Sequence, residues 1–155
     1  MTIRTESRIS IAGSVQEVWA YVCDVRRWPE WAPTVLECWV PEGAPLRPGS
    51  RVEQRAKAIL GLTRGRSQGV TAVEAPRHVA FAGPMGTSAA RWGMELKPVD
   101  DGRTDAMMWI EVDLAGIMRV LPAGMLARRI QRVSDLEMVA IKAAVESAAR
   151  EGAVS

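Results

Sequence analysis

Glu137 is the carboxylate in this sequence whose position most favours proton chemistry, because it interrupts an otherwise apolar helical pattern. At about 100° per residue it falls at the centre of a narrow arc on a predicted long helix. The apolar side chains on that arc are Leu126, Ile130, Val133, Ile141 and Ala144. A carboxylate facing an apolar surface is costly unless it is paired or hydrated, and desolvation raises its pKa. Glu137 is therefore a candidate proton donor or a polar anchor for a ligand hydroxyl. The alternative is a helix that curves or shifts and lets Glu137 reach solvent or an arginine.

The other residues that could carry chemistry lack the spacing of known catalytic and metal sites. The sequence has no phosphate-binding P-loop, no G-x-S-x-G motif and no dinucleotide fingerprint. Cys23 and Cys38 form no C-x-x-C motif, and His78 is the single histidine, so we expect no metal and no cofactor. His78 follows "EAPR" at the start of a predicted strand, where a side chain is usually solvated. This position argues against a role for His78 as a catalytic base.

Composition favours one globular domain covering residues 1–155. The apolar fraction is 48% and the charged fraction 25%, and the net charge of +2 is too small to indicate nucleic acid or an anionic membrane as partner. The apolar runs are shorter than the roughly 20 residues of a membrane span, and the first residues lack a signal-peptide core. Two cysteines make no disulfide framework, which favours a reducing cytoplasm.

Alternation and turn signals predict how these residues are positioned. Ile3, Thr5, Ser7, Ile9 and Ile11 share one face of a first strand. A capping box of Ser14 and Glu17 begins a short helix over about 14–23, and Pro29 suits the first turn of a second short helix that ends at Pro33. Further strands are predicted over 35–40, 51–60, 66–74, 78–83, 87–97 and 104–115. The glycine- and proline-rich turns between them favour an antiparallel meander.

The strand patterns also predict which face of the sheet is covered. In 104–115 the residues Ala106, Met108, Ile110, Val112 and Leu114 share one face, and in 51–60 the inward residues are Val52, Gln54, Ala56, Ala58 and Leu60. The cover is a long helix from Pro122 to about Arg150. Arg128, Arg129 and Arg132 fall away from its apolar arc, so we expect a solvated outer face there.

The segment "SVQEVWAYVCDVRRWPEW", followed by the strand entry "GSRV", resembles the SRPBCC (START-like) superfamily in its polyketide cyclase/dehydrase branch. The resemblance covers nearly the whole chain and implies an α+β helix-grip fold. In that fold a curved antiparallel sheet of about six to seven strands wraps the long helix, with two short helices after the first strand. It also implies a deep apolar cavity. Trp28 and Trp31 would close one end of it, either as plugs of the core or, for Trp31, in direct contact with a ligand.

The resemblance implies that the cavity face carries the binding residues. We expect the ligand site to include Trp31, Gln54, Ala56, Ser88, Trp92, Met94, Met108, Ile110, Glu137 and Ile141. Small residues leave space, methionine adapts to irregular apolar shapes, and Gln54, Ser88 and Glu137 supply the polar groups.

Three functions follow as hypotheses. The first is binding of a small apolar or aromatic, polyketide- or lipid-like molecule. The second is a cyclase or dehydratase that uses Glu137 for proton transfer, and the third is a regulatory or interaction module with a filled core. The sequence alone leaves the ligand, any reaction and the oligomeric state open.

Overall fold

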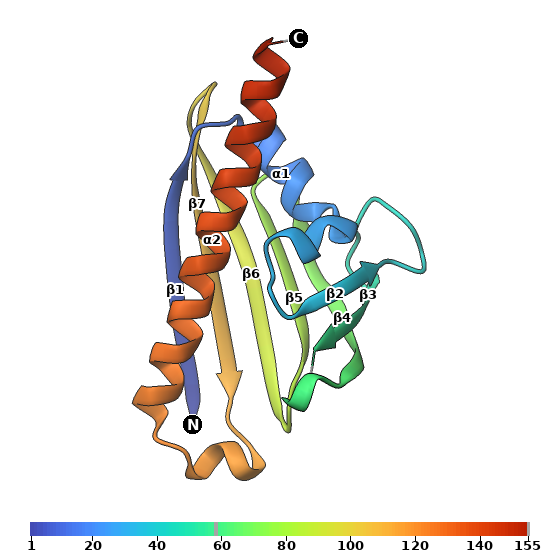
Figure 1. Ribbon diagram of the computed structural model, residues 1–155, viewed down its shortest axis with the longest axis vertical. Coiled ribbons are helices and arrows are strands. Elements are labelled where there is room, and N and C mark those ends of the chain that lie inside the picture. Colours follow the sequence, from blue (N-terminus) through green and yellow to red (C-terminus); the bar gives the residue numbers. More distant parts are fainter. Residues whose placement is uncertain (58, 155) are drawn as a thin grey trace.

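A curved seven-stranded antiparallel sheet forms the centre of the protein in the computed structural model, which describes residues 1–57 and 59–154 (Figure 1). The strands lie in the order β1-β7-β6-β5-β4-β3-β2. Their bounds are β1 (Thr2–Ile11), β2 (Val35–Trp39), β3 (Arg51–Lys57), β4 (Thr63–Glu74), β5 (His78–Met85), β6 (Ser88–Asp100) and β7 (Arg103–Asp113). From β2 to β7 each strand pairs with the next along the chain, as a meander requires, and β1 closes the far edge against β7.

Helical segments lie on one face of this sheet and at its ends (Figure 1). They are α1 (Val15–Cys23), the 3-10 turns η1 (Val25–Glu30), η2 (Ile59–Gly61) and η3 (Gly116–Val120), and the long helix α2 (Ala123–Val154). The predicted cap of α1 is confirmed, since the Ser14 hydroxyl accepts a hydrogen bond of 3.1 Å from the backbone N–H of Glu17. The predicted helix-grip fold is confirmed as well. None of the helices described is both long enough and apolar enough to cross a membrane.

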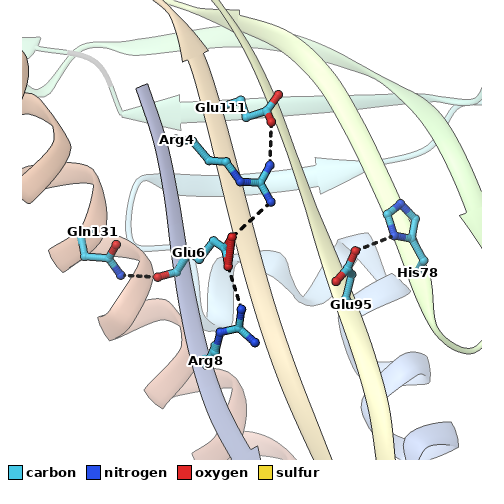
Figure 2. A network of polar contacts seen from close by, with 7 residues as sticks. All are labelled: Arg4, Glu6, Arg8, His78, Glu95, Glu111 and Gln131. Carbon is cyan, nitrogen blue, oxygen red and sulfur yellow. Dashed lines mark hydrogen bonds and ion pairs between the residues drawn. The ribbon is translucent and has the colours of Figure 1, made fainter. Parts of the chain in front are cut away.

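The predicted sidedness of the sheet is confirmed in β7, where Ala106, Met108 and Val112 are buried on the helix side. Figure 2 shows part of the opposite face, on which Arg4 lies between the carboxylates of Glu111 and Glu6. Charged side chains on neighbouring strands therefore pair across the outer face while apolar ones fill the inner face.

The structure corrects two predicted boundaries and adds one turn. The third strand ends at Lys57, and Leu60 turns outward, 92% exposed, because its backbone takes the left-handed region at φ 66° inside η2. Ala58, which the sequence placed in that strand, lies outside the described residues. The second short helix begins at Val25 and contains Pro29 near its end. The turn η3 was not predicted at all.

Helix α2 crosses the sheet on the side of β1 and β7, and α1 packs beside it at the far end (Figure 1). In this half of the molecule Met138, Ile141 and Val145 are buried in the main core. The remaining inner surface, over β3 to β6, faces the first half of α2 across a pocket.

Candidate functional site

The pocket has a volume of about 490 Å³ and lies between the sheet and the first half of α2. That volume falls within the range of about 300–1,000 Å³ typical of small-molecule sites. Six residues expected from the sequence lie in its lining, namely Trp31, Gln54, Trp92, Met108, Ile110 and Glu137. They come from the end of η1, from β3, β6 and β7, and from α2.

Four other expected residues are not among the residues that line the pocket. Met94 and Ile141 belong to the closed part of the core, where they are 2% and 0% exposed. Ala56 is buried in β3 and pairs in register with Val35 of β2. The Ser88 hydroxyl accepts a hydrogen bond of 3.0 Å from the backbone N–H of Ala115, so it fastens the end of β7 to β6. Each of these side chains therefore has a structural explanation in the fold.

One wall of the pocket is aromatic. The rings of Phe81 and Trp92 stack at 4.4 Å and 17°, and Trp28 meets both edge-on, with a centroid distance of 5.2 Å to each. Trp31 stands 5.8 Å from Trp28 and 6.5 Å from Trp92. Tilted and offset contacts of this kind are the favourable arrangements of aromatic rings. The cluster thus holds the flat faces that border the pocket in a fixed geometry.

The local sequence explains how Trp28 and Trp31 reach this wall. Asp24 ends α1, and η1 begins directly after it. Arg27 covers the ring of Tyr21 at 4.8 Å and donates to Glu30 over 3.1 Å, so the charged side of η1 packs outward. The opposite side of η1 then turns its tryptophans inward.

Buried polar atoms without a partner gather in this pocket. Among the described residues, five buried side-chain nitrogen or oxygen atoms lack a hydrogen-bond partner, and four of them belong to residues of the lining. These four are Trp31 Nε1, Gln54 Oε1, Arg66 Nε and Ser134 Oγ, and the fifth is Thr5 Oγ1 in β1. Native proteins rarely leave such atoms unpaired, and each one costs about 1–3 kcal/mol. Their concentration in one pocket indicates a place where a polar group or ordered water belongs.

Gln68 provides the contrast within the same lining. Its Oε1 accepts a hydrogen bond of 2.7 Å from Trp92 Nε1, so this pair is satisfied within the protein. Gln54 and Arg66 are register partners in β3 and β4, and neither Gln54 Oε1 nor Arg66 Nε has such a bond. The unpaired acceptor and the unpaired donor therefore lie side by side on two neighbouring strands.

Glu137 is partly buried and lines the pocket from α2. Removal of its carboxyl from water raises its pKa from 4.5 to about 7, although the charge of Arg66 lowers it in part. Glu137 and Arg66 form no ion pair in the part of the chain that the structure describes. The pocket thus holds a carboxyl that can lose or gain a proton near neutral pH, together with a fixed positive charge.

Arg66, Gln68 and Ser134 are among the polar lining residues that sequence reasoning missed, and Arg129, which was expected on a solvated outer face, lines the pocket as well. Arg66 and Gln68 lie on the same face of β4 as buried Val70, because side chains alternate along a strand. An arginine on the face that alternation assigns to the interior could have indicated a polar site. Ser134 lies three residues before Glu137, one helical turn away on α2. Nothing in the sequence marked it, because a lone serine in a helix is usually exposed.

No group of three or more histidine, cysteine, aspartate or glutamate side chains comes together in the part of the chain that the structure describes. His78 stands on the outer face of the sheet, where its Nδ1 is 3.7 Å from Glu95 Oε1 (Figure 2). Burial raises the pKa of the Cys23 and Cys38 thiols to about 12, which keeps both protonated and unreactive.

Solved structures share this architecture at low sequence identity. The START superfamily protein from Mycobacterium smegmatis has 15% identity and a TM-score of 0.76, over 94% of this chain and 98% of that one. The Zhui aromatase/cyclase from Streptomyces sp. R1128 has 16% identity and a TM-score of 0.74, over 94% of each chain. The di-domain ARO/CYC BexL from the BE-7585A biosynthetic pathway has 18% identity and a TM-score of 0.74, over 92% of this chain and 46% of that one.

These identities are low enough that the likeness shows the fold alone. No curated protein matches the chain in sequence. The family model described as polyketide cyclase / dehydrase and lipid transport matches residues 2–146. Because that match spans most of the sequence, the chain belongs to the polyketide cyclase/dehydrase and lipid transport family.

Proposed function

We propose that the protein binds a small aromatic or apolar molecule that carries oxygen substituents, in the pocket between α2 and the sheet. The observation that carries the proposal is the set of four unpaired buried polar atoms, on Trp31, Gln54, Arg66 and Ser134, in an otherwise largely apolar lining. A purely apolar ligand would leave these atoms unsatisfied, whereas hydroxyl or carbonyl groups would pair with them. The aromatic wall supplies flat surfaces for the body of such a molecule.

The donors and acceptors define where the oxygens of the ligand would lie. Trp31 Nε1 and Arg66 Nε can only donate, so they suit a carbonyl, phenolate or enolate oxygen. Gln54 Oε1 accepts and suits a hydroxyl, and Ser134 Oγ can do either. This pattern supports a polyketide-like ligand over a plain hydrocarbon chain.

Binding is tested by calorimetric titration with a matched pair of probes, 2-naphthol and naphthalene. Both have the same ring system, but only 2-naphthol offers an oxygen to the unpaired atoms. We expect 2-naphthol to bind at least about tenfold more tightly, since a hydrogen bond to a charged group is worth about 1.5–3 kcal/mol. Equal affinities for the two probes, or no binding of either, would overturn the proposal.

Arg66→Met keeps the length of the side chain and removes its charge and donors. In this variant the preference for 2-naphthol is expected to fall while the affinity for naphthalene stays. Arg64→Met is the matched control, since Arg64 is two residues away on β4, exposed, and not among the lining residues. The third hypothesis, a filled core without a ligand, requires that neither probe binds.

Glu137 supports catalysis as a second candidate function. Its carboxyl has a pKa of about 7 and faces the same pocket as Arg66. When ionised, it can remove a proton from the carbon next to a carbonyl group, and Arg66 can stabilise the enolate oxygen that forms; the carboxyl, now protonated, can then give that proton to the departing hydroxyl, which leaves as water. This is the chemistry of a cyclase or dehydratase. Incubation with a linear poly-β-carbonyl thioester, analysed by mass spectrometry for loss of water, tests this function, and Glu137→Gln is expected to abolish the loss.

A further inference from the structure

The segment between β7 and the second turn of α2 exposes large apolar side chains at one end of the molecule (Figure 1). Ile117 is 73% exposed, Val120 79%, Met125 63% and Leu121 44%. We refer to these four residues as the rim patch. Leu121 also lines the pocket, as does Met118 next to Ile117. The rim patch is therefore continuous with the apolar lining of the pocket.

The same segment carries charge of one sign. From Leu114 to Ser134 the sequence contains Arg119, Arg128, Arg129 and Arg132, and no aspartate, glutamate or lysine. Within the part of the chain that the structure describes, these four side chains make no hydrogen bond or ion pair. Elsewhere arginines are commonly paired, as Arg4 is with Glu111 and Arg27 with Glu30. The rim patch is thus bordered by positive charge that the protein itself does not neutralise.

From this juxtaposition we infer that the rim patch docks on the surface of a bilayer containing anionic phospholipid. Exposed apolar side chains would enter the interfacial region, and the arginines would meet the phosphate groups, the combination that holds amphipathic segments on membranes. Met125, Arg128 and Arg132 follow one another at three- and four-residue steps, so one face of α2 presents both kinds of side chain.

An acidic protein surface is the competing partner. The geometry favours the bilayer because η3 and the start of α2, which carry the exposed apolar side chains, lie at the tip of the molecule (Figure 1). A bilayer accepts protruding side chains without a complementary pocket, whereas a protein partner must supply one. The sequence interpretation of Arg128, Arg129 and Arg132 as a merely solvated face did not include the apolar residues of η3, which it had not predicted.

Docking at this place would also bring the pocket next to the bilayer. An apolar ligand could then pass between membrane and pocket along Leu121 and Met118 without crossing bulk water. That consequence rests on the proposed ligand-binding function, whereas docking itself does not. The two are separated by measuring vesicle binding and probe binding independently.

The experiment is co-sedimentation of the full chain with sucrose-loaded vesicles of phosphatidylcholine alone or with a minority of phosphatidylglycerol. We expect at least about tenfold stronger binding to the anionic vesicles, reduced by high salt. Ile117→Ser with Val120→Ser, and separately Arg119→Gln with Arg128→Gln and Arg132→Gln, are each expected to reduce binding at least about tenfold. None of these five residues lines the pocket, so the titration with 2-naphthol should be unchanged in the same variants.

Matched controls lie at the opposite end of the sheet. Val99→Ser removes an apolar side chain that is 54% exposed near the β6–β7 turn, and Arg77→Gln removes an exposed charge at the β4–β5 turn. Both controls are expected to bind vesicles as the wild type does. Equal binding of the wild type to neutral and anionic vesicles would overturn the inference, as would failure to bind either. Unchanged binding by both rim variants would overturn it too.

Discussion

Trp28 and Trp31 lie with their ring centroids 5.8 Å apart, but only Trp28 has a hydrogen-bond partner for its indole nitrogen. Trp28 Nε1 donates to the backbone carbonyl of Val22 over 2.9 Å and so ties η1 to the end of α1. Trp31 Nε1 is buried and unpaired in the pocket lining. Two tryptophans three residues apart are therefore in different chemical situations, one complete within the fold and one with an open donor.

Substitutions at these positions should separate stability from binding. Trp28→Ala removes a side chain that is 1% exposed and should lower the free energy of unfolding by about 3–5 kcal/mol. Trp31→Phe keeps an aromatic ring and deletes an unpaired donor, so it should cost far less stability and reduce the preference for 2-naphthol over naphthalene. Urea denaturation and calorimetric titration measure the two effects. A larger stability loss for Trp31→Phe than for Trp28→Ala would contradict this division.

Gly93 gives a prediction about the outer face of the sheet. A Cβ at this position would lie 2.7 Å from the backbone carbonyl oxygen of Val79 and 2.7 Å from the ring of Trp109, which Arg4 covers in turn at 5.4 Å. Because a backbone atom cannot move aside cheaply, Gly93→Ala should lower the free energy of unfolding by about 1–3 kcal/mol.

Gly65→Ala is the matched control for Gly93→Ala, since Gly65 is also in a strand and its nearest neighbour to an added Cβ is 3.9 Å away. This change should be neutral or slightly stabilising, because alanine loses less backbone entropy on folding. The melting temperatures of the two variants, measured by thermal unfolding under the same conditions, test this difference. Similar melting temperatures for both would mean that the sheet relaxes around Gly93.

The fold could be predicted from the sequence wherever one face of an element is apolar and the other charged. β7 is an example, since Ala106, Met108 and Val112 share the inner face, and the outer face carries Asp105, Glu111 and Asp113 besides Met107 and Trp109. The end of β3 could not be predicted, because Leu60 continues the alternation in sequence but leaves the sheet through a positive φ that the pattern does not encode. Hydrophobic periodicity indicates which residues prefer burial, but it does not indicate where the backbone turns.

The pocket was harder to predict, because its character depends on exceptions to the pattern. The buried stripe of α2 runs through Ser134, Met138, Ile141 and Val145, whereas the sequence arc passed through Val133, which is 39% exposed. Because Ser134 is polar, the predicted apolar face was drawn through Val133, one position away from the residue that is buried. Arg66 was passed over for a similar reason, because a charge in a strand is normally assigned to the outer face.

Metal removal should have no effect on stability. Within the described chain no set of three potential ligand side chains is close enough to hold an ion. Extensive dialysis against a chelator is therefore expected to leave the melting temperature unchanged, and added Zn²⁺ should not raise it. A fall in the melting temperature after chelation would reveal a site built from other ligands, such as backbone carbonyls.

The carboxyl of Glu137 leads to a prediction about pH. Its pKa in the folded protein is about 7, against an ordinary value of 4.5. Below the ordinary pKa the carboxyl is protonated in both the folded and the unfolded state, so its ionisation makes no difference to stability. As the pH rises toward 7, the unfolded state loses its proton first, so the folded state becomes relatively less stable. Above the folded pKa this decrease in the free energy of unfolding is complete, and it amounts to about 3 kcal/mol at most.

Glu137→Gln cannot ionise and should lack this dependence. The variant is therefore expected to gain stability relative to the wild type as the pH rises from below the ordinary glutamate pKa to above neutrality. Urea denaturation of both proteins across that range measures the difference at each pH. Glu146→Gln serves as the control, because Lys142 lowers the pKa of Glu146 through a hydrogen bond of 2.7 Å, and the effect there should have the opposite sign.

Stability curves for Glu137→Gln and wild type that run parallel would show that the Glu137 carboxyl reaches water in the folded state. Proton donation from Glu137 to a ligand would then lose its physical basis, and binding would remain as the function that the pocket supports.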